Sequence, residues 1–291
     1  MATSVQQRPE QPAPAPANVE RRHSRLRLFG LLLPSLGWMV VIYLGSLFVL
    51  FLAAFWQLDP FTGLVVHKWG FQNFTKIVTQ NVYLITAART LGMAAAVTVT
   101  DIALALPIAY YAARMASPRR RSLILLAVVL PLWSSYLVRV FAWRVILSSH
   151  GLLSWLFFGR LHVGFSMWAL WLTFTYLWLP FVILPIYASL ERVSPSLIEA
   201  SGDLGAEAWT TFRRVIWPLA IPGIVAGSIF SFSLTLGDYI APTLVSNTQF
   251  IGNIVYQETG VAGNTPFAAA YALVPVLIVG IYLLIARRLG A

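Results

Sequence analysis

The chain of 291 residues contains no cysteine and few charges. The absence of cysteine excludes disulfides and thiolate chemistry. Only 10% of the residues are charged, whereas a soluble domain typically carries about 25%. Hydrophobic residues make up 58% of the chain, and their runs are longer and more continuous than the amphipathic helices of one soluble domain allow. The composition therefore predicts a membrane protein that crosses the bilayer several times.

The sequence also lacks the residue patterns of common catalytic sites. There is no Gly-Lys pair, so a P-loop for ATP hydrolysis is excluded. The four histidines are scattered and none has metal-ligand spacing, and no nucleophile lies in a recognisable pattern with a base: His23, His67, His150 and His162. We therefore expect no catalytic residue, no metal site and no cofactor in this chain, which predicts that it is not an enzyme.

Six apolar runs have the length of about 20 residues that a helix needs to cross a bilayer. They cover residues 28–56, 87–113, 122–147, 165–190, 217–245 and 267–286. The first run exceeds the 7–15 residues or so of a signal-peptide core and is expected to be a retained span. The sequence thus predicts an all-α protein with six transmembrane helices.

The runs also suggest a division of the chain. Residues 1–24 are rich in Pro, Ala and Gln and end in a basic cluster, so we expect a disordered tail there. The first transmembrane helix and an outer loop are predicted over 25–86, and a five-helix core over 87–291. Prolines inside the runs favour kinked helices around a pathway, although proline is also generally commoner in membrane helices.

Basic residues are concentrated on one side of the predicted spans. They occur before the first span, between the second and third, around residues 192–214 and at the end of the chain: Arg21, Arg22, Arg25, Arg27, Arg114, Arg119, Arg120, Arg121, Arg192, Arg213, Arg214, Arg287 and Arg288. The opposite loops hold only Lys68, Lys76 and Arg160. The positive-inside rule then places both termini in the cytoplasm. This distribution explains the net charge of +10 without a nucleic-acid partner.

One polar stretch, residues 194–218, interrupts the apolar chain. Ser194 is a suitable N-cap and Pro195 suits the first helical position. Three carboxylates recur every fourth residue, at Glu199, Asp203 and Glu207, and Gly205 favours a turn. The pattern predicts a helix–turn–helix at the cytoplasmic surface, either a solvated loop or a docking element for a partner.

The stretch "EASGDLGAEAWTTFRRVIWP" resembles the EAA loop of ABC importer permeases: Glu-Ala-Ala, three residues, Gly, nine residues, then Ile-x-Leu-Pro. Glu199, Ala200, Gly205 and Pro218 match this pattern. The departures are mild changes of size: Ser201, Val215 and Trp217. In such permeases this loop is the coupling helix that sits in a cleft of the ATPase subunit. The resemblance implies a type I ABC importer permease fold and an ATPase-coupling role for Glu199, Ala200, Ser201, Asp203, Gly205 and Pro218.

Three further segments look like the spermidine/putrescine-type branch, in its first-permease subgroup: "PLWSSYLVRVFAWRVILSSHGLLS", "LPFVILPIYASLERV" and "SFSLTLGDYIAPTLV". The resemblance implies a bacterial inner-membrane protein surrounded by membrane lipid. Its implied partners are a second permease, two ATP-binding subunits and an extracytoplasmic solute-binding protein. ATP-Mg would bind only to the partner ATPases.

Ionisable residues within or beside spans are candidates for the substrate path, because a charge at the bilayer centre costs roughly 2.5–3.5 kcal/mol on insertion scales. Asp101 lies near the middle of the second span and Asp238 near the outer end of the fifth, beside Tyr239. Arg139 lies toward the outer end of the third span. The acids either line a cation route or form structural ion pairs with Arg89, Arg139 or Arg144.

The leading hypothesis is a permease that moves polyamines or a related small organic solute by alternating access. Related permeases also serve metal complexes, phosphonates and vitamins such as thiamine. A secondary carrier working alone would predict an internal repeat, and no convincing repeat is visible. A membrane scaffold would not need so many prolines in its spans.

Overall fold

The computed structural model describes residues 18–156 and 164–288, and for residues 18–31 and 35 it describes the backbone only. It divides into two compact units, Met1–Leu50 and Phe51–Ala291. Most of the tail expected over residues 1–24 and the outer-loop Arg160 lie outside the described residues. Helix α1, Asn18–Ala53, begins within the segment expected to be the tail. Its apolar part, Leu32–Ala53, is long enough to span a membrane.

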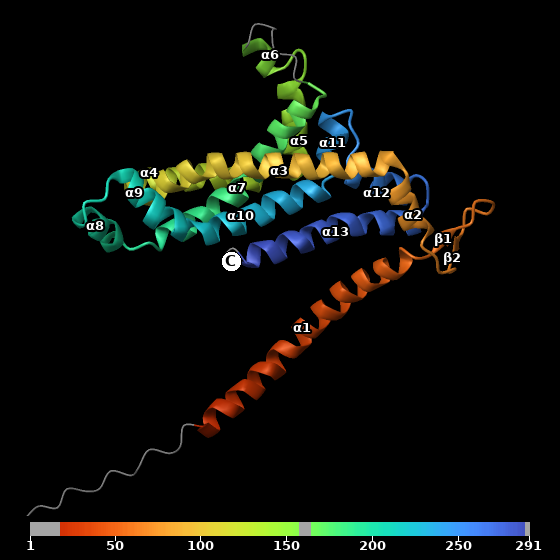
Figure 1. The fold of residues 1–291 in the computed structure, drawn as a ribbon, viewed down its shortest axis with the longest axis horizontal. Helices are drawn as coiled ribbons and strands as arrows, with labels where there is room; N and C mark the ends of the chain where they lie inside the picture. The colour runs from red at the N-terminus through yellow and green to blue at the C-terminus, as the bar shows by residue number, and fades with distance from the viewer. Residues whose placement is uncertain (1–17, 157–163, 289–291) are drawn as a thin grey trace, which may run out of the picture. The chain divides into compact units, whose positions relative to one another are not determined.

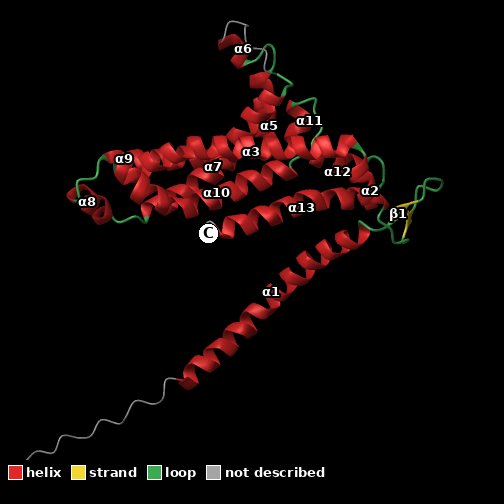
Figure 2. Cartoon of the chain, viewed as in Figure 1, coloured by secondary structure: helices red, strands yellow, loops and turns green. Residues whose placement is uncertain are grey.

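The described part of the second unit consists of helices joined by loops, with one small hairpin (Figure 2). Strands β1, Gln57–Leu58, and β2, Val65–Val66, pair antiparallel in this hairpin. The short helix α2, Gln72–Thr79, follows, and Asn73 donates hydrogen bonds to the carbonyls of Ala54 and Trp56. These contacts hold the end of α1 against the start of α2.

Four long helices of the second unit run side by side (Figure 1). They are α3, Asn81–Tyr110; α7, Met167–Glu191; α10, Trp217–Gly237; and α13, Thr265–Arg288. Each of them makes up all or most of a continuous helical segment that is long and apolar enough to span a membrane. The second, fourth, fifth and sixth predicted spans are therefore helices.

The third predicted span is broken rather than continuous. It consists of α4, Pro118–Val129, the 3-10 turn η2, Leu130–Trp133, then α5, Tyr136–Leu147, and α6, Leu152–Leu156. The two parts meet at an angle of 99°. Pro131 lacks a backbone donor, and the extended backbone of Ser134 completes the bend. The described residues thus contain five spanning helices, or six spans if the bent pair is one span.

The closest approach of two spans is between α7 and α10. Gly223 and Gly227 lie one turn apart on α10, in the Gly-xxx-Gly spacing that lets membrane helices pack backbone to backbone. A Cβ atom at Gly223 would lie 2.5 Å from the carbonyl oxygen of Pro185, and one at Gly227 would lie 2.9 Å from Cα of Val182. No larger residue fits at this crossing without moving one of the helices.

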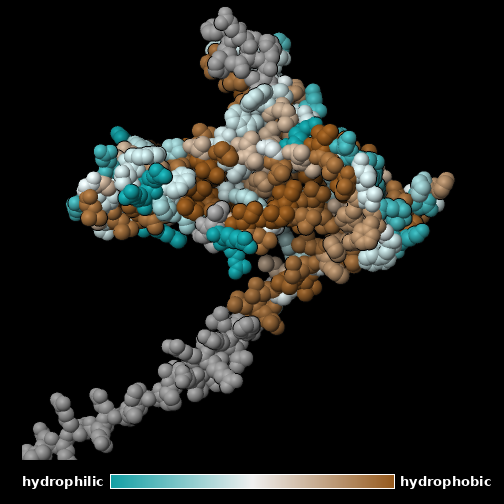
Figure 3. Space-filling view, viewed as in Figure 1, coloured by the Kyte–Doolittle hydropathy of each residue, from teal (hydrophilic) through white to brown (hydrophobic). Residues whose placement is uncertain are grey.

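Shorter elements lie at the two ends of the bundle, which we call the α8 end and the α12 end (Figure 1). At the α8 end are the π-helical turn η1, Tyr111–Met115, then α8, Pro195–Asp203, α9, Ala208–Thr211, and the π-helical turn η3, Phe212–Ile216. At the other end are α11, Ile240–Val245, and α12, Ile251–Gly260. Hydrophobic residues cover the middle of the bundle in Figure 3, and hydrophilic ones gather toward its ends.

Candidate functional site

The 194–218 loop folds as the two short helices expected from its sequence. Pro195 is the first residue of α8, and Gly205 adopts a left-handed φ of 76° in the turn before α9. The N–H of Gly205 donates to Gly202 O and that of Ala206 to Ser201 O, so the end of α8 is a Schellman turn. Nothing lies within 4 Å of a Cβ built at Gly205. Backbone geometry rather than space therefore requires glycine there.

The second short helix continues into the membrane span without a break. After α9, the turn η3 leads directly into α10, where Pro218 is the second residue. The helix is continuous over Ala208–Gly237, and the π-helical turn η3 lies just before Pro218, which has no N–H to donate to the preceding turn.

Ser201 has a contact that its sequence position did not predict. Its Oγ lies 2.9 Å from Oγ1 of the buried Thr211, so a hydroxyl pair joins α8 to α9. The motif has Ala at this position, and Thr211 supplies the only sequence signal, a second hydroxyl ten residues further on. Ser201 therefore fixes the angle between the two short helices.

The outer face of the loop is open and partly apolar. Glu199, Ala200 and Asp203 are exposed, and a hollow of about 620 Å³ lies between the two short helices. Leu204 is 88% exposed and Trp209 is 68% exposed. Sequence reasoning named the carboxylates but missed these two side chains. Exposed apolar residues rimmed by charge are typical of a protein-binding surface.

A second candidate site lies where α10 ends, on the side away from α8. A cavity of about 380 Å³ is lined by residues from four helices, α5, α7, α10 and α11, and from the connection between α10 and α11: Tyr136, Trp178, Ser233, Leu234, Gly237, Asp238, Tyr239 and Ile240. We call it the Asp238 pocket. The rings of Tyr136 and Trp178 stack at a centroid distance of 5.9 Å. Tyr239 stacks on Tyr256 of α12 at 4.7 Å.

The Asp238 carboxylate is held by three donors. Oδ1 accepts from the backbone N–H groups of Ile240, at 2.8 Å, and Ala241, at 3.1 Å. Oδ2 accepts from the hydroxyl of Tyr136 on α5. A carboxylate offers about four lone-pair positions, so one remains for a ligand. Asp238 thus caps α11, joins α5 to α10 and still faces the pocket.

Neither acid forms the ion pairs that sequence reasoning considered. Within the described ranges the only ion pair joins Arg121 and Glu191. Asp101 is fully buried on α3, and its Oδ2 accepts a hydrogen bond of 2.6 Å from Ser231 on α10. The structure therefore does not bring Asp101 to the Asp238 pocket.

The three arginines near the outer ends of the second and third spans form no ion pair with an acid among the described residues. Arg89 donates to the carbonyl of Gln249 at 3.1 Å, and Arg144 lies 5.3 Å from the centre of the Phe165 ring. Nε and Nη1 of Arg139 are buried and have no hydrogen-bond partner among the described residues. The same holds for Oγ1 of Thr175, Nε1 of Trp178 and Oγ of Ser233. Such atoms are rare in folded proteins, and their concentration on α5, α7 and α10 marks this region as unusual.

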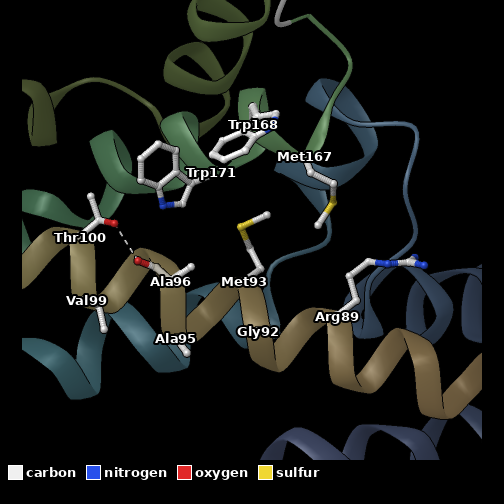
Figure 4. A pocket seen from close by; sticks show the side chains of 10 residues that line it. All are labelled: Arg89, Gly92, Met93, Ala95, Ala96, Val99, Thr100, Met167, Trp168 and Trp171. Carbon is white, nitrogen blue, oxygen red and sulfur yellow. Dashed lines mark hydrogen bonds between the residues drawn. The ribbon is translucent and has the colours of Figure 1, made fainter.

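An apolar groove of about 750 Å³ lies between α3 and the start of α7. Figure 4 shows Met93 of α3 pointing toward Trp168 and Trp171 of α7, with Arg89 at one end. Small residues of α3 form its floor: Gly92, Ala95 and Ala96. The groove carries no acidic residue, so it is distinct from the Asp238 pocket.

Comparisons with known proteins agree with the loop and the helical bundle. The family model described as "Binding-protein-dependent transport system inner membrane component" matches residues 105–291. The inner membrane ABC transporter permease protein YdcU of Escherichia coli (strain K12) is 42% identical over 100% of this chain and 99% of its own length. The chain belongs to the inner-membrane permeases of binding-protein-dependent ABC importers.

Further relatives of this permease support the same assignment. The spermidine/putrescine transport system permease protein PotB of Escherichia coli (strain K12) is 28% identical over 87% of this chain and 94% of its own length. A chain in the crystal structure of a bacterial ABC transporter involved in the import of the acidic polysaccharide alginate superposes with a TM-score of 0.73 at 18% identity. The superposition covers 94% of this permease and 100% of that chain, so the two chains share a fold.

The family also settles several general expectations for this permease. It is a multi-pass inner-membrane protein with the all-helical ABC importer permease fold, and it works with a binding protein and ATPases. It is not itself catalytic and needs no cofactor of its own. In the described part of the chain, no group of three or more His, Cys, Asp or Glu side chains is placed to hold a metal ion.

Proposed function

We propose that this permease imports polyamines, such as spermidine and putrescine, or a related small organic cation. The observation that carries the proposal is the Asp238 pocket, where a carboxylate without a basic partner among the described residues lies beside aromatic rings. A carboxylate attracts ammonium groups, and aromatic faces add cation–π attraction. The pocket volume falls in the range of about 300–1,000 Å³ that is typical of small-ligand sites.

The 28% identity with the spermidine/putrescine permease PotB supports the same substrate class. We assign Asp238 and Tyr239 to the substrate path, with Tyr136 and Trp178 as further members. Arg139 remains a candidate beside the path, because its unpaired guanidinium lies one helical turn from Tyr136. Asp101 is a weaker candidate, since its carboxylate faces Ser231.

The 194–218 loop is proposed to couple the permease to its ATPases. A second permease and two ATP-binding subunits would complete the complex, with both chain termini and the loop in the cytoplasm. Glu199 and Asp203 offer charge, Leu204 and Trp209 offer apolar area, and Gly205 gives the loop its shape. Closure of the ATPases would move the loops and rock the bundles between inward- and outward-facing states.

Uptake in proteoliposomes tests the substrate class. The complete complex is reconstituted with its binding protein, and ATP-driven uptake of labelled putrescine and spermidine is compared with that of thiamine and methylphosphonate. Polyamine uptake is expected, and it should fall about tenfold or more in Asp238→Asn, since an amide cannot neutralise an ammonium group. Uptake of thiamine or methylphosphonate without polyamine uptake would overturn the proposal.

A separate experiment tests the loop. The permease is purified with the ATPase, and ATP turnover is measured for the wild type, Glu199→Ala and Gly205→Pro. Proline fixes φ near −65°, whereas Gly205 has a φ of 76°, so Gly205→Pro should lose the ATPase on purification. Unchanged assembly and turnover in both variants would exclude the coupling role.

A further inference from the structure

Two arginines at the α8 end bind the last turn of α7, immediately before the 194–218 loop. Nη2 of Arg114 donates to the carbonyl of Leu190 at 2.5 Å and also to the carbonyl of Val193. The last carbonyls of a helix have no partner within the helix and carry partial negative charge. Arg114 therefore caps the end of α7 from a different span.

Arg121 reinforces this contact from the first turn of α4. It pairs with Glu191, and its guanidinium lies 5.2 Å from the centre of the Tyr187 ring. The Arg121 and Glu191 side chains are 36% and 46% exposed, and exposed ion pairs contribute little. Nε of Arg114 is buried and has no hydrogen-bond partner among the described residues, and its Nη2 reaches two carbonyls. We therefore expect Arg114 to contribute more than Arg121 to holding the end of α7.

The segment that carries Arg114 also meets the other end of the loop. Arg114 belongs to η1, the π-helical turn that follows α3. Tyr110, directly before η1, packs edge to face on Phe212 at a centroid distance of 6.2 Å. Phe212 begins η3, the π-helical turn through which the chain returns to α10. The buried Ala112 and Ile216 belong to the same apolar cluster as the end of α7.

The end of α3 thus contacts the chain just before the 194–218 loop and also Phe212 in the last part of the loop. The turns η1 and η3 are both π-helical, and single π-helical turns are frequent at functional sites. We propose that η1 receives the movement of the 194–218 loop, and that Arg114 is the positioning residue that passes it to α3. This inference rests on the proposed coupling role of the loop.

The absence of cysteine allows a test that needs no transported solute. In the reconstituted complex, Val82→Cys and Val261→Cys carry spin labels on the outer end of α3 and on the exposed connection before α13. Pulsed electron paramagnetic resonance measures the distance between the labels with and without ATP. ATP should shift the distance distribution in the otherwise unchanged chain.

Arg114→Gln should reduce the fraction of molecules whose label distance changes with ATP by about tenfold, which is within the range of measured allosteric couplings. ATPase assembly and basal ATP turnover should persist, because the loop itself is intact. Arg120→Gln is the matched control: it removes the same charge from an exposed residue that has no side-chain hydrogen bond, ion pair or ring contact among the described residues. Arg114→Lys, which keeps a cationic donor, should recover part of the shift.

The possible outcomes separate the two proposals. If the wild type neither binds the ATPase nor responds to ATP, the coupling role of the loop fails, and the inference fails with it. If the wild type and Arg114→Gln respond equally, only the role of Arg114 is overturned. If Arg114→Gln does not assemble, Arg114→Lys takes its place, because it keeps the charge but cannot reproduce the planar guanidinium contact with both carbonyls. A smaller shift than in the wild type is then expected, and a shift equal to that of the wild type contradicts the inference.

Discussion

The 194–218 loop and the Asp238 pocket are built in opposite ways. The loop is a local structure: Pro195, Gly205 and the Schellman turn lie within twelve residues of one another. The pocket is assembled from distant segments, since Tyr136 and Asp238 are 102 residues apart. A local structure survives changes in the bundle and can serve as a docking module, whereas an assembled pocket changes whenever its helices move. This difference suits the two proposed roles, a coupling loop that keeps its own shape when it moves and a substrate pocket that changes shape with its helices.

We expect the largest effect from a change at the crossing of α7 and α10, because the loop and the pocket both depend on these two helices. Gly223→Leu would place a side chain where a Cβ already lies 2.5 Å from the Pro185 carbonyl, so α7 and α10 must separate. Overpacking of this kind typically costs about 1–3 kcal/mol or more, and we expect loss of folded protein. Thermal unfolding in detergent measures this. Gly280→Leu is the control, since nothing lies within 4 Å of its Cβ position; equal losses in both variants would contradict the packing argument.

A smaller but selective effect is expected from Asp238. Asp238→Ala leaves Tyr136, Ile240 and Ala241 without their acceptor, and each unsatisfied buried group costs about 1–3 kcal/mol. Asp238→Asn keeps an acceptor oxygen but removes the charge. Alanine should therefore lower both the melting temperature and polyamine uptake, and asparagine mainly uptake. An asparagine variant with wild-type uptake would show that Asp238 only holds the helices together.

Gly205→Ala should affect the loop and spare the pocket. A left-handed conformation costs a residue with a Cβ roughly 1–2 kcal/mol, and space is free around this position. We expect weaker ATPase binding, by about tenfold, with unchanged unfolding of the bundle. Gly202→Ala is a suitable control because Gly202 lies in α8 and also has free space. Binding affinity of the purified ATPase distinguishes the two variants.

Ser201→Ala should have the smallest effect. It restores the residue of the family motif but leaves the buried Thr211 hydroxyl without its partner. The cost is about 1 kcal/mol, which should lower ATPase binding only several-fold. The double variant with Thr211→Val removes both hydroxyls and should recover the loss. If the double variant binds more weakly than Ser201→Ala, the hydroxyl pair does not act as proposed.

The sequence predicted the elements more reliably than their contacts. Runs of apolar residues located the spans, and Pro195 and Gly205 located the ends of the short helices. Prolines inside the runs predicted kinks, and the third span is bent just after Pro131, but the angle of 99° was not predicted because a proline indicates a break without its angle. Of the two alternatives left open for Asp101 and Asp238, ion pairs were not found among the described residues, where Ser231 and Tyr136 donate hydrogen bonds to these acids.

The sequence alone determined that the chain spans a membrane repeatedly, lacks a P-loop and carries a loop with permease spacing. These properties depend on composition and on neighbours within one or two helical turns, so they can be read along the chain. Only the tertiary structure decided that Asp238 accepts a hydrogen bond from Tyr136, and that Arg114 caps α7 from the end of α3. Such partners lie about 75–100 residues apart, and only helix packing brings them together.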